Sequence, residues 1–286
     1  MQEHNGNTRE KHLWLIELLA WWQGHVNSSD LRDTFRFSRQ QAQKYIDQYK
    51  TRYPANLYYD THQKAFLPGR NFQQHLISGD VSEYLDWLNQ SGNTDNITTA
   101  NPTNTPLTNA SLSLPKRQVA PKIMRALISA MQKRQRVEIG YVSMSTPDDI
   151  GRVIQPHTFV KTGLRWHLRA YDETHNAFRD FVLSRFRGEP ELSGPATHSQ
   201  QDDPGWNTQV ELIFKPDPRL KPAQQQIIEQ DYQMQNGCLT LTTRAALAQY
   251  LLQEMQINPK FLAGSPEAQQ LILDNLSDIK PWLFDN

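Results

Sequence analysis

The sequence is poor in the residues that build covalent cross-links and structural metal sites. It contains one cysteine, Cys238, in 286 residues. A single thiol cannot form an internal disulfide, and a structural zinc site needs several ligands at regular spacing. No cationic start leads into an apolar run, and the longest apolar stretch, residues 13–22, is interrupted by Glu17 and is about half as long as a bilayer span. We therefore expect a cytoplasmic protein with no bound metal.

Sequence motifs of the common enzyme classes are missing too. There is no P-loop, dinucleotide fingerprint or nucleophile elbow, and the histidines do not form the H-E-x-x-H pattern of zinc hydrolases. The acidic pairs at 148–149 and 202–203 stand beside proline or glycine, which is typical of solvated turns. His157 follows Pro156 and could act as a general base, although a histidine at a strand end is more often structural. The sequence therefore indicates a protein that is not an enzyme and needs no cofactor.

Neither sign of charge dominates the chain. Thirty Lys and Arg residues balance thirty Asp and Glu residues, which argues against a protein that coats nucleic acid indiscriminately. A basic domain can still be offset by an acidic one, so the local distribution matters more than the sum. The length suits two or three compact units, and a hydrophobic fraction of 37% is sufficient for their cores.

One segment differs from the rest in composition. Residues 91–115 contain one charged residue and no aromatic residue, and consist mostly of Asn, Thr, Ser and Pro. Such a segment cannot bury enough surface to offset its ordering entropy, which predicts a flexible linker. The expected organisation is an N-terminal domain over 1–90, the linker over 91–115, a middle domain over 116–200 and a C-terminal domain over 201–286.

The pattern before the linker predicts three helices, a hairpin and a further helix. Apolar residues at helical spacing indicate helices over 9–22, 27–35 and 38–52, and Ser38 is a suitable cap for the third. Two short apolar runs, 57–59 and 65–67, flank the polar turn 61–64, which is typical of a hairpin. A helix over 81–89 follows. This order is that of a winged helix-turn-helix domain, which binds DNA.

The third predicted helix carries the residues expected to read DNA. Ala42, Tyr45, Ile46 and Tyr49 follow helical spacing and form its buried face, which leaves polar side chains exposed near its start. Arginine reads guanine and glutamine reads adenine in the major groove, and residues 31–54 carry six basic and two acidic side chains, a net of +4. A solvated helix face is the alternative. The predicted DNA-binding residues, with the hairpin tip included, are Ser38, Arg39, Gln40, Gln41, Gln43, Lys44, His62 and Lys64.

The pattern after the linker predicts a mixed helix and sheet region. A helix over 120–135 precedes strands over 137–144, 153–160, 164–171 and 178–186, which favours a small barrel or a strongly bent sheet. Past Trp206 the pattern changes to strand 209–214, helix 221–231, strand 238–242 and helix 245–255. That order predicts a separate α+β module, so the whole chain is expected to be an α+β multidomain protein.

Strand alternation in the middle region predicts a cationic surface with aromatic rings. Along 164–171, the side chains of Arg165, His167, Arg169 and Tyr171 share one face, and along 178–187 Arg179 and Arg185 share one. If these faces converge, guanidinium groups and rings would bind a nucleotide or a short nucleic acid. The alternative is an ordinary outer face on which arginines pair with Glu138, Asp172 or Asp180.

These strands resemble a known family. The run Arg165-Trp166-His167-Leu168-Arg169-Ala170-Tyr171, followed by 178–181 and 184–185, resembles the WYL domain of bacterial transcriptional regulators, although His167 stands where the family's tyrosine would be. The start of the third helix, 38–42, looks like the branch of repressors associated with anti-phage defence operons such as BREX and CBASS. The resemblance implies a winged helix-turn-helix, an Sm-like (SH3-like) β-barrel and a C-terminal dimerisation module. The ligand-binding candidates that it implies are Tyr141, Ser143, Ser145, His157, Arg165, His167, Arg169, Tyr171, Arg179 and Arg185.

Together with the sequence patterns, this resemblance implies a homodimeric repressor of a phage-defence operon. It would bind a palindromic double-stranded operator and release it in response to a nucleotide or nucleic-acid effector. One alternative is a nucleic-acid-processing enzyme that uses the Arg/His/Tyr-rich face, although no carboxylate cluster at metal-binding spacing accompanies that face. Another alternative is an adaptor whose barrel binds a protein.

Overall fold

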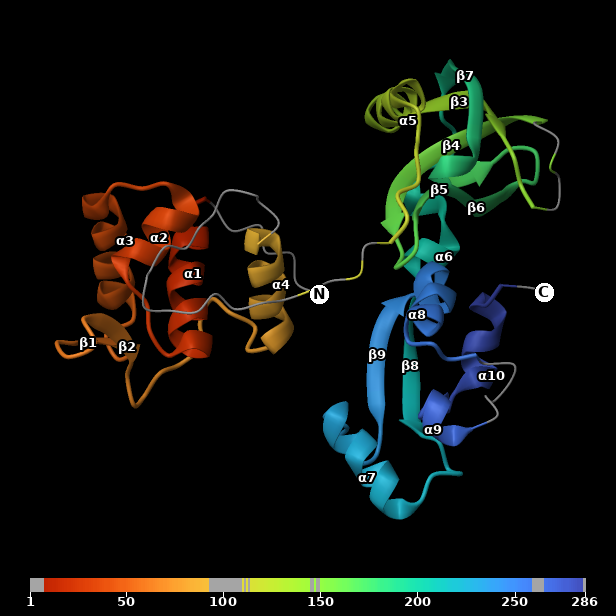
Figure 1. Ribbon diagram of the computed structural model, residues 1–286. Coiled ribbons are helices and arrows are strands. Elements are labelled where there is room, and N and C mark those ends of the chain that lie inside the picture. Colours follow the sequence, from red (N-terminus) through yellow and green to blue (C-terminus); the bar gives the residue numbers. More distant parts are fainter. Residues whose placement is uncertain are drawn as a thin grey trace. The chain divides into compact units, whose positions relative to one another are not determined.

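The structure is a computed structural model that describes residues 8–92, 110, 112, 114–144, 147, 150–258 and 265–284. The chain divides into two compact units, residues 1–113 and 114–286 (Figure 1). Among the described residues, no helix is both long and apolar enough to cross a membrane. The linker predicted over 91–115 lies mostly outside the described residues.

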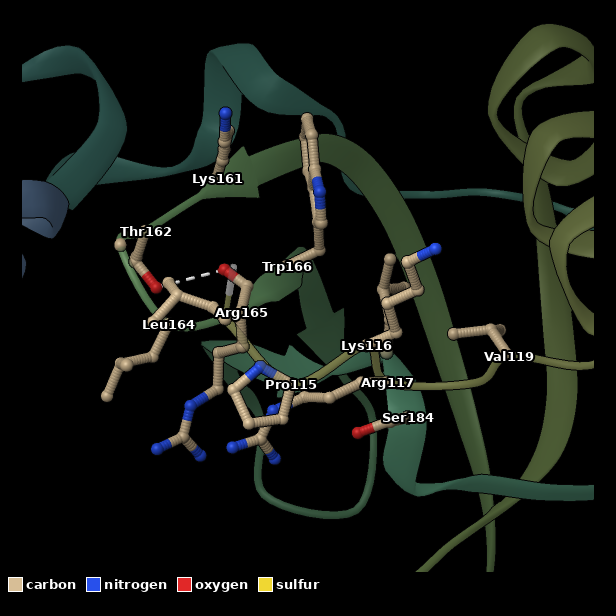
Figure 2. Close-up of a pocket in the computed structure, with 13 residues that line it drawn as sticks. Pro115, Lys116, Arg117, Val119, Lys161, Thr162, Leu164, Arg165, Trp166 and Ser184 are labelled. Carbon is tan, nitrogen blue, oxygen red and sulfur yellow. Dashed lines mark hydrogen bonds between the residues drawn. The ribbon is translucent and has the colours of Figure 1, made fainter. Parts of the chain in front are cut away.

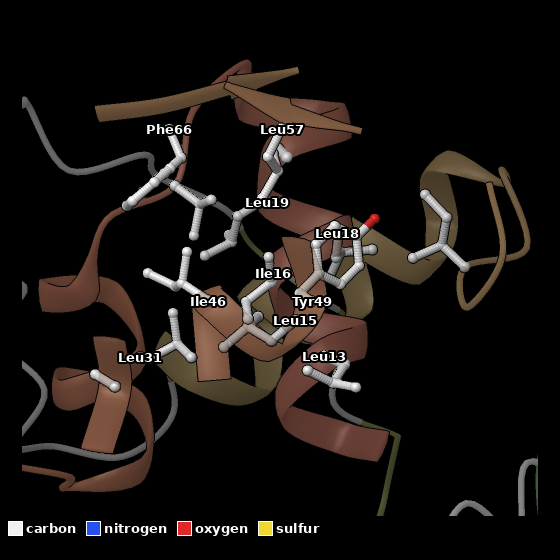
Figure 3. Packing of buried hydrophobic residues seen from close by; sticks show 14 of the residues in the cluster. Leu13, Leu15, Ile16, Leu18, Leu19, Leu31, Ile46, Tyr49, Leu57 and Phe66 are labelled. Atoms are coloured by element: carbon white, nitrogen blue, oxygen red, sulfur yellow. The ribbon is translucent and has the colours of Figure 1, made fainter. Parts of the chain in front are cut away.

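The first unit has the predicted order of three helices, a two-stranded hairpin and a fourth helix. Its helices and strands are α1 (Thr8–Gln23), α2 (Ser28–Phe35), α3 (Arg39–Arg52), β1 (Leu57–Asp60), β2 (Ala65–Pro68) and α4 (Val81–Gly92). Ile16, Leu31 and Ile46 come from the three successive helices and are fully buried in one cluster, as Figure 3 shows. The loop after α1 is fixed to the hairpin, because Val26 and Phe66 exchange two backbone hydrogen bonds. The hairpin is therefore anchored beside the helices.

The buried carboxylate of Glu17 binds the segment that follows the hairpin, residues 75–77. Glu17 of α1 is fully buried and accepts hydrogen bonds from the Tyr49 hydroxyl at 2.8 Å and from the backbone amides of His75, Leu76 and Ile77. Burial raises the pKa of Tyr49, which therefore stays a neutral donor. The segment that leads to α4 is thus held against α1 and α3 by one acidic side chain.

The second unit opens with a helix on a five-stranded antiparallel sheet. The strand order is β6-β5-β4-β3-β7, and α5 places Ile123, Leu127 and Ala130 in the core that it shares with the sheet. The elements are α5 (Pro121–Lys133), β3 (Gln135–Tyr141), β4 (Ile150–Lys161), β5 (Trp166–Asp172), β6 (Ala177–Val182), the 3-10 turn η1 (Leu183–Arg185) and β7 (Phe186–Pro195).

The sheet is strongly curled but is not the closed Sm-like barrel that the resemblance implies. In the described residues, the edge strands β6 and β7 each pair with one neighbour, so the ladder does not close. Only residues 183–185 connect these two edges. Four virtual bonds reach at most about 14 Å, whereas four strand spacings in a flat sheet span about 19 Å. The short connection therefore requires a bent sheet.

Two strand predictions are wrong in detail. The pattern predicts a single strand over 178–186, but β6 ends at Val182 and η1 follows. The sequence also hides β7, because this strand contains Gly188, Pro190 and Gly194. An edge strand tolerates proline, and Pro190 lies in the register shift between the two pairs that β7 forms with β3, Gly140↔Arg187 and Glu138↔Glu191.

The remainder of the second unit is an α+β module, as predicted. A three-stranded antiparallel sheet of order β10-β8-β9 packs its apolar side chains with those of α7 and α8. The sequence does not reveal β10, which has only three residues. The elements are η2 (Gln200–Asp202), α6 (Pro204–Asn207), β8 (Gln209–Pro216), α7 (Pro222–Asp231), β9 (Leu239–Arg244), η3 (Ala245–Leu247), α8 (Ala248–Glu254), α9 (Pro266–Gln269), β10 (Leu271–Leu273), α10 (Leu276–Ile279) and η4 (Lys280–Trp282).

Candidate nucleic-acid interface and ligand pocket

Helix α3 presents a polar face at its N-terminal end. Ala42, Ile46 and Tyr49 are fully buried against α1, which fixes the rotation of the helix. Ser38 caps the helix by accepting a hydrogen bond from the Gln41 amide at 3.2 Å. Gln43 is half-buried and donates to Asp47. The exposed predicted DNA-binding residues on this helix and its cap are Ser38, Arg39, Gln40, Gln41 and Lys44.

The hairpin tip has a fixed backbone. Asp60 Oδ1 accepts hydrogen bonds from the amides of His62 and Gln63, both at 2.8 Å, and Lys64 adopts a left-handed conformation with φ +52°. His62 and Lys64 are exposed. Since Lys50 of α3 lies 5.2 Å above the ring of Phe66, the hairpin also contacts the C-terminal part of α3. A wing held in this way can present two cationic or polar groups to a phosphate backbone.

The predicted cationic face of β5 is covered by the chain itself. Arg169 donates to Asp203 with distances of 2.7 and 3.1 Å, and its guanidinium also lies 3.4 Å from Asp180. The Asp203 carboxylate lies 3.2 Å from His157 Nε2 and accepts a hydrogen bond from the Trp206 amide. Burial alone would raise the pKa of Asp203, but the hydrogen bonds from His157 and Arg169 outweigh it and hold the pKa well below its usual range. The cluster joins the sheet to residues 203–206.

Two further candidates on this sheet, Tyr171 and Tyr141, also have partners within the chain. The Tyr171 ring stacks on His198 with centroids 3.7 Å apart, and the Tyr141 hydroxyl accepts a hydrogen bond from the Val182 amide. Ser143 and Arg185 are half-buried. Ser145 lies outside the described residues. The ligand roles assigned to these residues stay predictions.

The expected convergence of arginines on one face is wrong for Arg179. The register pairs Arg169 with Asp180 and Ala170 with Arg179, so Arg179 lies on the opposite side of the sheet from Arg169. Directly paired residues in an antiparallel ladder share a face, whereas successive residues alternate. Arg179 therefore lies on the face of the sheet that carries the core, but β6 is an edge strand and the Arg179 side chain is exposed.

A separate pocket lies at the β4–β5 turn. The cavity has a volume of about 250 Å³, and one of the ten candidates, Arg165, lines it. Its other lining residues come from the turn and the strand ends beside it, from η1 and from the segment before α5, and Figure 2 labels ten of the residues that line the pocket. They are Leu114, Pro115, Lys116, Arg117, Val119, Lys161, Thr162, Gly163, Leu164, Trp166, Leu183 and Ser184.

Sequence reasoning missed most of this pocket. Strand alternation assigned Trp166 to the same side as the core residues Leu168 and Ala170, but Trp166 is 50% exposed. It stands at the end of β5, beyond the part of the strand that packs on the core. Lys116 and Arg117 directly follow the predicted linker, which has no basic residue, and this pair of charges could have drawn attention to the segment.

His167, a buried histidine of β5, lies near this pocket, and the positive charges around it affect its pKa. His167 is 5% exposed, its ring lies 4.9 Å from that of Tyr250, and its Nδ1 atom has no hydrogen-bond partner among the described residues. Burial, and then the charges of Arg165, Arg185 and Arg117, lower the pKa of His167 to about 4. The imidazole is therefore neutral near pH 7. Within the described ranges, no group of three or more His, Cys, Asp or Glu residues could hold a metal ion.

Three family profiles match successive parts of the chain. The BrxR transcriptional regulator winged helix-turn-helix domain matches residues 8–90, the WYL domain matches 122–188, and the BrxR C-terminal dimerization domain matches 209–279. These matches fall on the first unit, the five-stranded sheet and the α+β module. Arg169 and the turn that carries Arg165 lie within the WYL match, whereas residues 114–119, which also line the pocket, precede it. We call the cavity at this turn the basic pocket.

Whole-chain relatives agree with this order. The DNA-binding transcriptional repressor CapW of Pseudomonas aeruginosa is 32% identical over 272 residues, which cover 95% of this chain and 91% of that protein. CapW of Escherichia coli (strain KTE188) is 31% identical over 271 residues, 95% of this chain and 90% of that protein. Among solved structures, PafBC of Arthrobacter aurescens matches 97% of this chain and 46% of that chain with a TM-score of 0.33 and 15% identity, which is too low to carry an argument. On the identity and coverage of the first two relatives, this chain belongs to the family of the CapW transcriptional repressors.

Proposed function

We propose that this chain is a transcriptional repressor that binds a palindromic operator as a homodimer and controls a phage-defence operon. The exposed N-terminal face of α3 carries the proposal: Arg39 and Gln40 stand in the first turn of a helix whose opposite face is fully buried. Such residues read base edges when the helix enters the major groove. The repressor names of the relatives and the match to a dimerization domain support the same role. The proposed role is regulatory, not catalytic.

The operator contacts divide between bases and phosphates. In this proposal Arg39, Gln40 and Gln41 contact base edges, while Lys44 and the hairpin tip with His62 and Lys64 contact the backbone. A dimer would place two such helices one helical turn of DNA apart, which explains the expected palindrome. The domain boundaries predicted near residues 115 and 200 are part of the same proposal.

The second part of the proposal is an anionic effector that binds to the WYL region. The basic pocket combines Lys116, Arg117, Lys161 and Arg165 with the exposed ring of Trp166, and among the described residues that line it none is acidic. Guanidinium groups bind phosphate through paired hydrogen bonds, and exposed rings stack on bases. A nucleotide or a short nucleic acid is therefore the effector class that we propose. The effector would weaken operator binding only if it binds the released state more tightly.

The test is an operator-binding assay with the upstream intergenic DNA of the chain's own gene. Binding is measured by gel shift at two salt concentrations, with unrelated DNA as competitor. Tight binding that resists competition is expected, and Arg39→Ala and Gln40→Ala should each weaken it by about 5–150-fold, the value of one paired base contact. Arg125→Ala is the matched control, because Arg125 is exposed on α5 in the other unit.

Three outcomes would each contradict part of the proposal. Binding that disappears with unrelated competitor or modest salt would reflect electrostatic attraction alone. Cleavage of the DNA that depends on Mg²⁺ would instead favour the nucleic-acid-processing enzyme. Unchanged affinity in both α3 variants would remove this helix as the reader of the operator.

A further inference from the structure

The segment that enters the second unit forms part of the basic pocket. Residues 114–119 precede α5 and follow the part of the chain that connects the two units. Five of these six residues line the cavity, and Lys116 and Arg117 supply two of the four cationic side chains among its described lining residues. The other two, Lys161 and Arg165, come from the β4–β5 turn. The pocket is therefore built jointly by the WYL sheet and by the segment that leads to the DNA-binding unit.

The two arginines are the groups best placed to act together. Figure 2 shows the side chains of Arg117 and Arg165 extending to the same side of the pocket, next to Pro115. Burial is the main cause of the lowered pKa of the neighbouring His167, and both guanidinium charges lower it further. The Thr162 hydroxyl donates to the Arg165 carbonyl at 3.0 Å, and the amides of Thr162 and Arg165 each donate to the other residue's carbonyl, which holds the turn in place. Arg165 thus projects from a fixed turn, whereas Arg117 projects from the entering segment.

Two like charges held close together repel each other unless an anion lies between them. In the part of the chain that the structure describes, no acidic residue lines the pocket. One carboxylate, that of Glu254, contacts the same turn by accepting a hydrogen bond from the Gly163 amide, but Glu254 does not line the pocket. The cationic pocket therefore has the charge that an anionic ligand would balance. Its volume of about 250 Å³ is slightly below the range of about 300–1,000 Å³ for small-molecule sites, which suits a group of nucleotide size or smaller.

We propose that a phosphate group binds between Arg117 and Arg165, so that Lys116 and Arg117 make the entering segment one wall of the effector site. This inference rests on the proposed function, because it names how the effector would act on the DNA-binding unit. An anion that pairs with both arginines holds the entering segment against the β4–β5 turn. Ligand occupancy then restricts the chain immediately after the connection between the units. If the DNA-bound and the released states differ in the freedom of this segment, the effector binds one of them more tightly and thereby alters operator binding.

The sequence offers a direct measurement of this restriction. Residues 71–115 contain no lysine or arginine, so Lys116 and Arg117 are the first tryptic sites after Arg70. Limited trypsin digestion of the full chain therefore reports the accessibility of the entering segment as fragments that end at residue 116 or 117. The probes are a 5′-phosphorylated thymidine trinucleotide and inorganic pyrophosphate. At about ten times the dissociation constant, cleavage at these two bonds should slow about tenfold, since only the unoccupied segment is accessible.

Three serine variants test the contribution of each arginine to probe binding and protection: one at each of the two pocket arginines, and one control outside the pocket. Arg165→Ser removes the fixed wall but leaves both tryptic sites in the entering segment. It should weaken probe binding about tenfold, so that the same probe concentration slows cleavage only about twofold. Arg117→Ser should weaken binding by a similar factor, measured by calorimetry. Arg125→Ser removes an exposed arginine of α5 outside the pocket, and should bind both probes as the unsubstituted chain does. Protection by both probes identifies phosphate as the group recognised, and protection by the trinucleotide alone adds a contribution from the base.

The outcomes distinguish this inference from the proposed function. If a probe releases operator DNA while cleavage at residues 116–118 and the affinity of Arg117→Ser stay unchanged, the entering segment is not part of the site, and the effector proposal survives. If neither probe binds or alters operator affinity while specific operator binding persists, the inference and the effector proposal are both overturned, and the repressor role remains.

Discussion

Arg169 of β5 and Asp203 at the N-terminus of α6 form a buried pair joined by two hydrogen bonds, at 2.7 and 3.1 Å. The Asp203 side chain is fully buried and that of Arg169 is 11% exposed. Burial alone would lower the pKa of Arg169, but Asp203 and Asp180 outweigh it and raise the pKa. Tyr250 of α8 donates to Asp180 at 3.1 Å, so the cluster extends from the WYL sheet to the C-terminal module. The pair is therefore the centre of the junction between the two parts of this unit.

Asp203→Ala should destabilise the second unit strongly. The substitution leaves Arg169 buried without its main partner and removes an acceptor from the Trp206 amide, and breaking one partner of a buried ion pair costs about 3–5 kcal/mol. Urea unfolding of the full chain, followed by tryptophan fluorescence, measures the change. Asp202→Ala is the matched control, because the neighbouring Asp202 is exposed. Equal unfolding midpoints for the two variants would show that the buried pair does not stabilise the junction.

Acid should destabilise this unit through His167. The pKa of His167 is about 4 in the folded chain, and an unfolded histidine has a pKa of about 6.5. Since the unfolded state binds the proton more tightly, stability is full above about pH 6.5 and falls by about 3 kcal/mol as the pH drops toward 4.

Unfolding at several pH values between 7 and 4 tests this. His167→Gln should flatten the pH dependence over that interval, whereas His62→Gln, at the exposed hairpin tip, should preserve it. An unchanged slope in His167→Gln would assign the acid sensitivity to other groups.

Glu17→Leu should lower the stability of the winged-helix unit by more than a substitution at an exposed position of the same helix. Glu17 accepts from the Tyr49 hydroxyl and from three backbone amides, and a leucine would leave these buried donors without an acceptor. Each buried unpaired donor costs about 1–3 kcal/mol, so the loss is a few kcal/mol or more. Hydrogen exchange of the amides of residues 75–77 measures it locally. Glu10→Leu, at an exposed position of the same helix, should leave those amides protected, and faster exchange in both variants would argue against a specific anchor.

Lys44→Ala and Arg39→Ala should differ in how salt affects operator binding. A phosphate contact contributes about one unit to the slope of log affinity against log salt, whereas a base contact contributes specificity. Lys44→Ala should therefore lower that slope by about one and weaken binding to all sequences alike. Arg39→Ala should lower the preference for the operator over unrelated DNA. Fluorescence anisotropy at four salt concentrations with both DNAs measures the two quantities, and identical behaviour of the variants would contradict the assignment of roles.

The order of elements could be predicted from the sequence where periodicity is strong. In α3, the spacing of Ala42, Ile46 and Tyr49 decides which face is buried, and the polar face at its start follows without tertiary information. The cap at Ser38 follows in the same way. Local rules failed at β7, whose glycines and Pro190 are allowed only because the strand lies at an edge of the sheet.

What the sequence by itself determined is the set of domains and the side chains available at each surface. Helical and strand periods depend on neighbours along the chain, so they can be read from the order of residues. Only the tertiary structure decided which surfaces are covered. Strand alternation predicted that Arg169 and Arg165 share one face. In the structure Asp203 covers Arg169, whereas Arg165 lines a pocket to which Arg117 also contributes. Burial of a charge depends on residues far away in the sequence, because the partner that offsets its desolvation is brought there by folding.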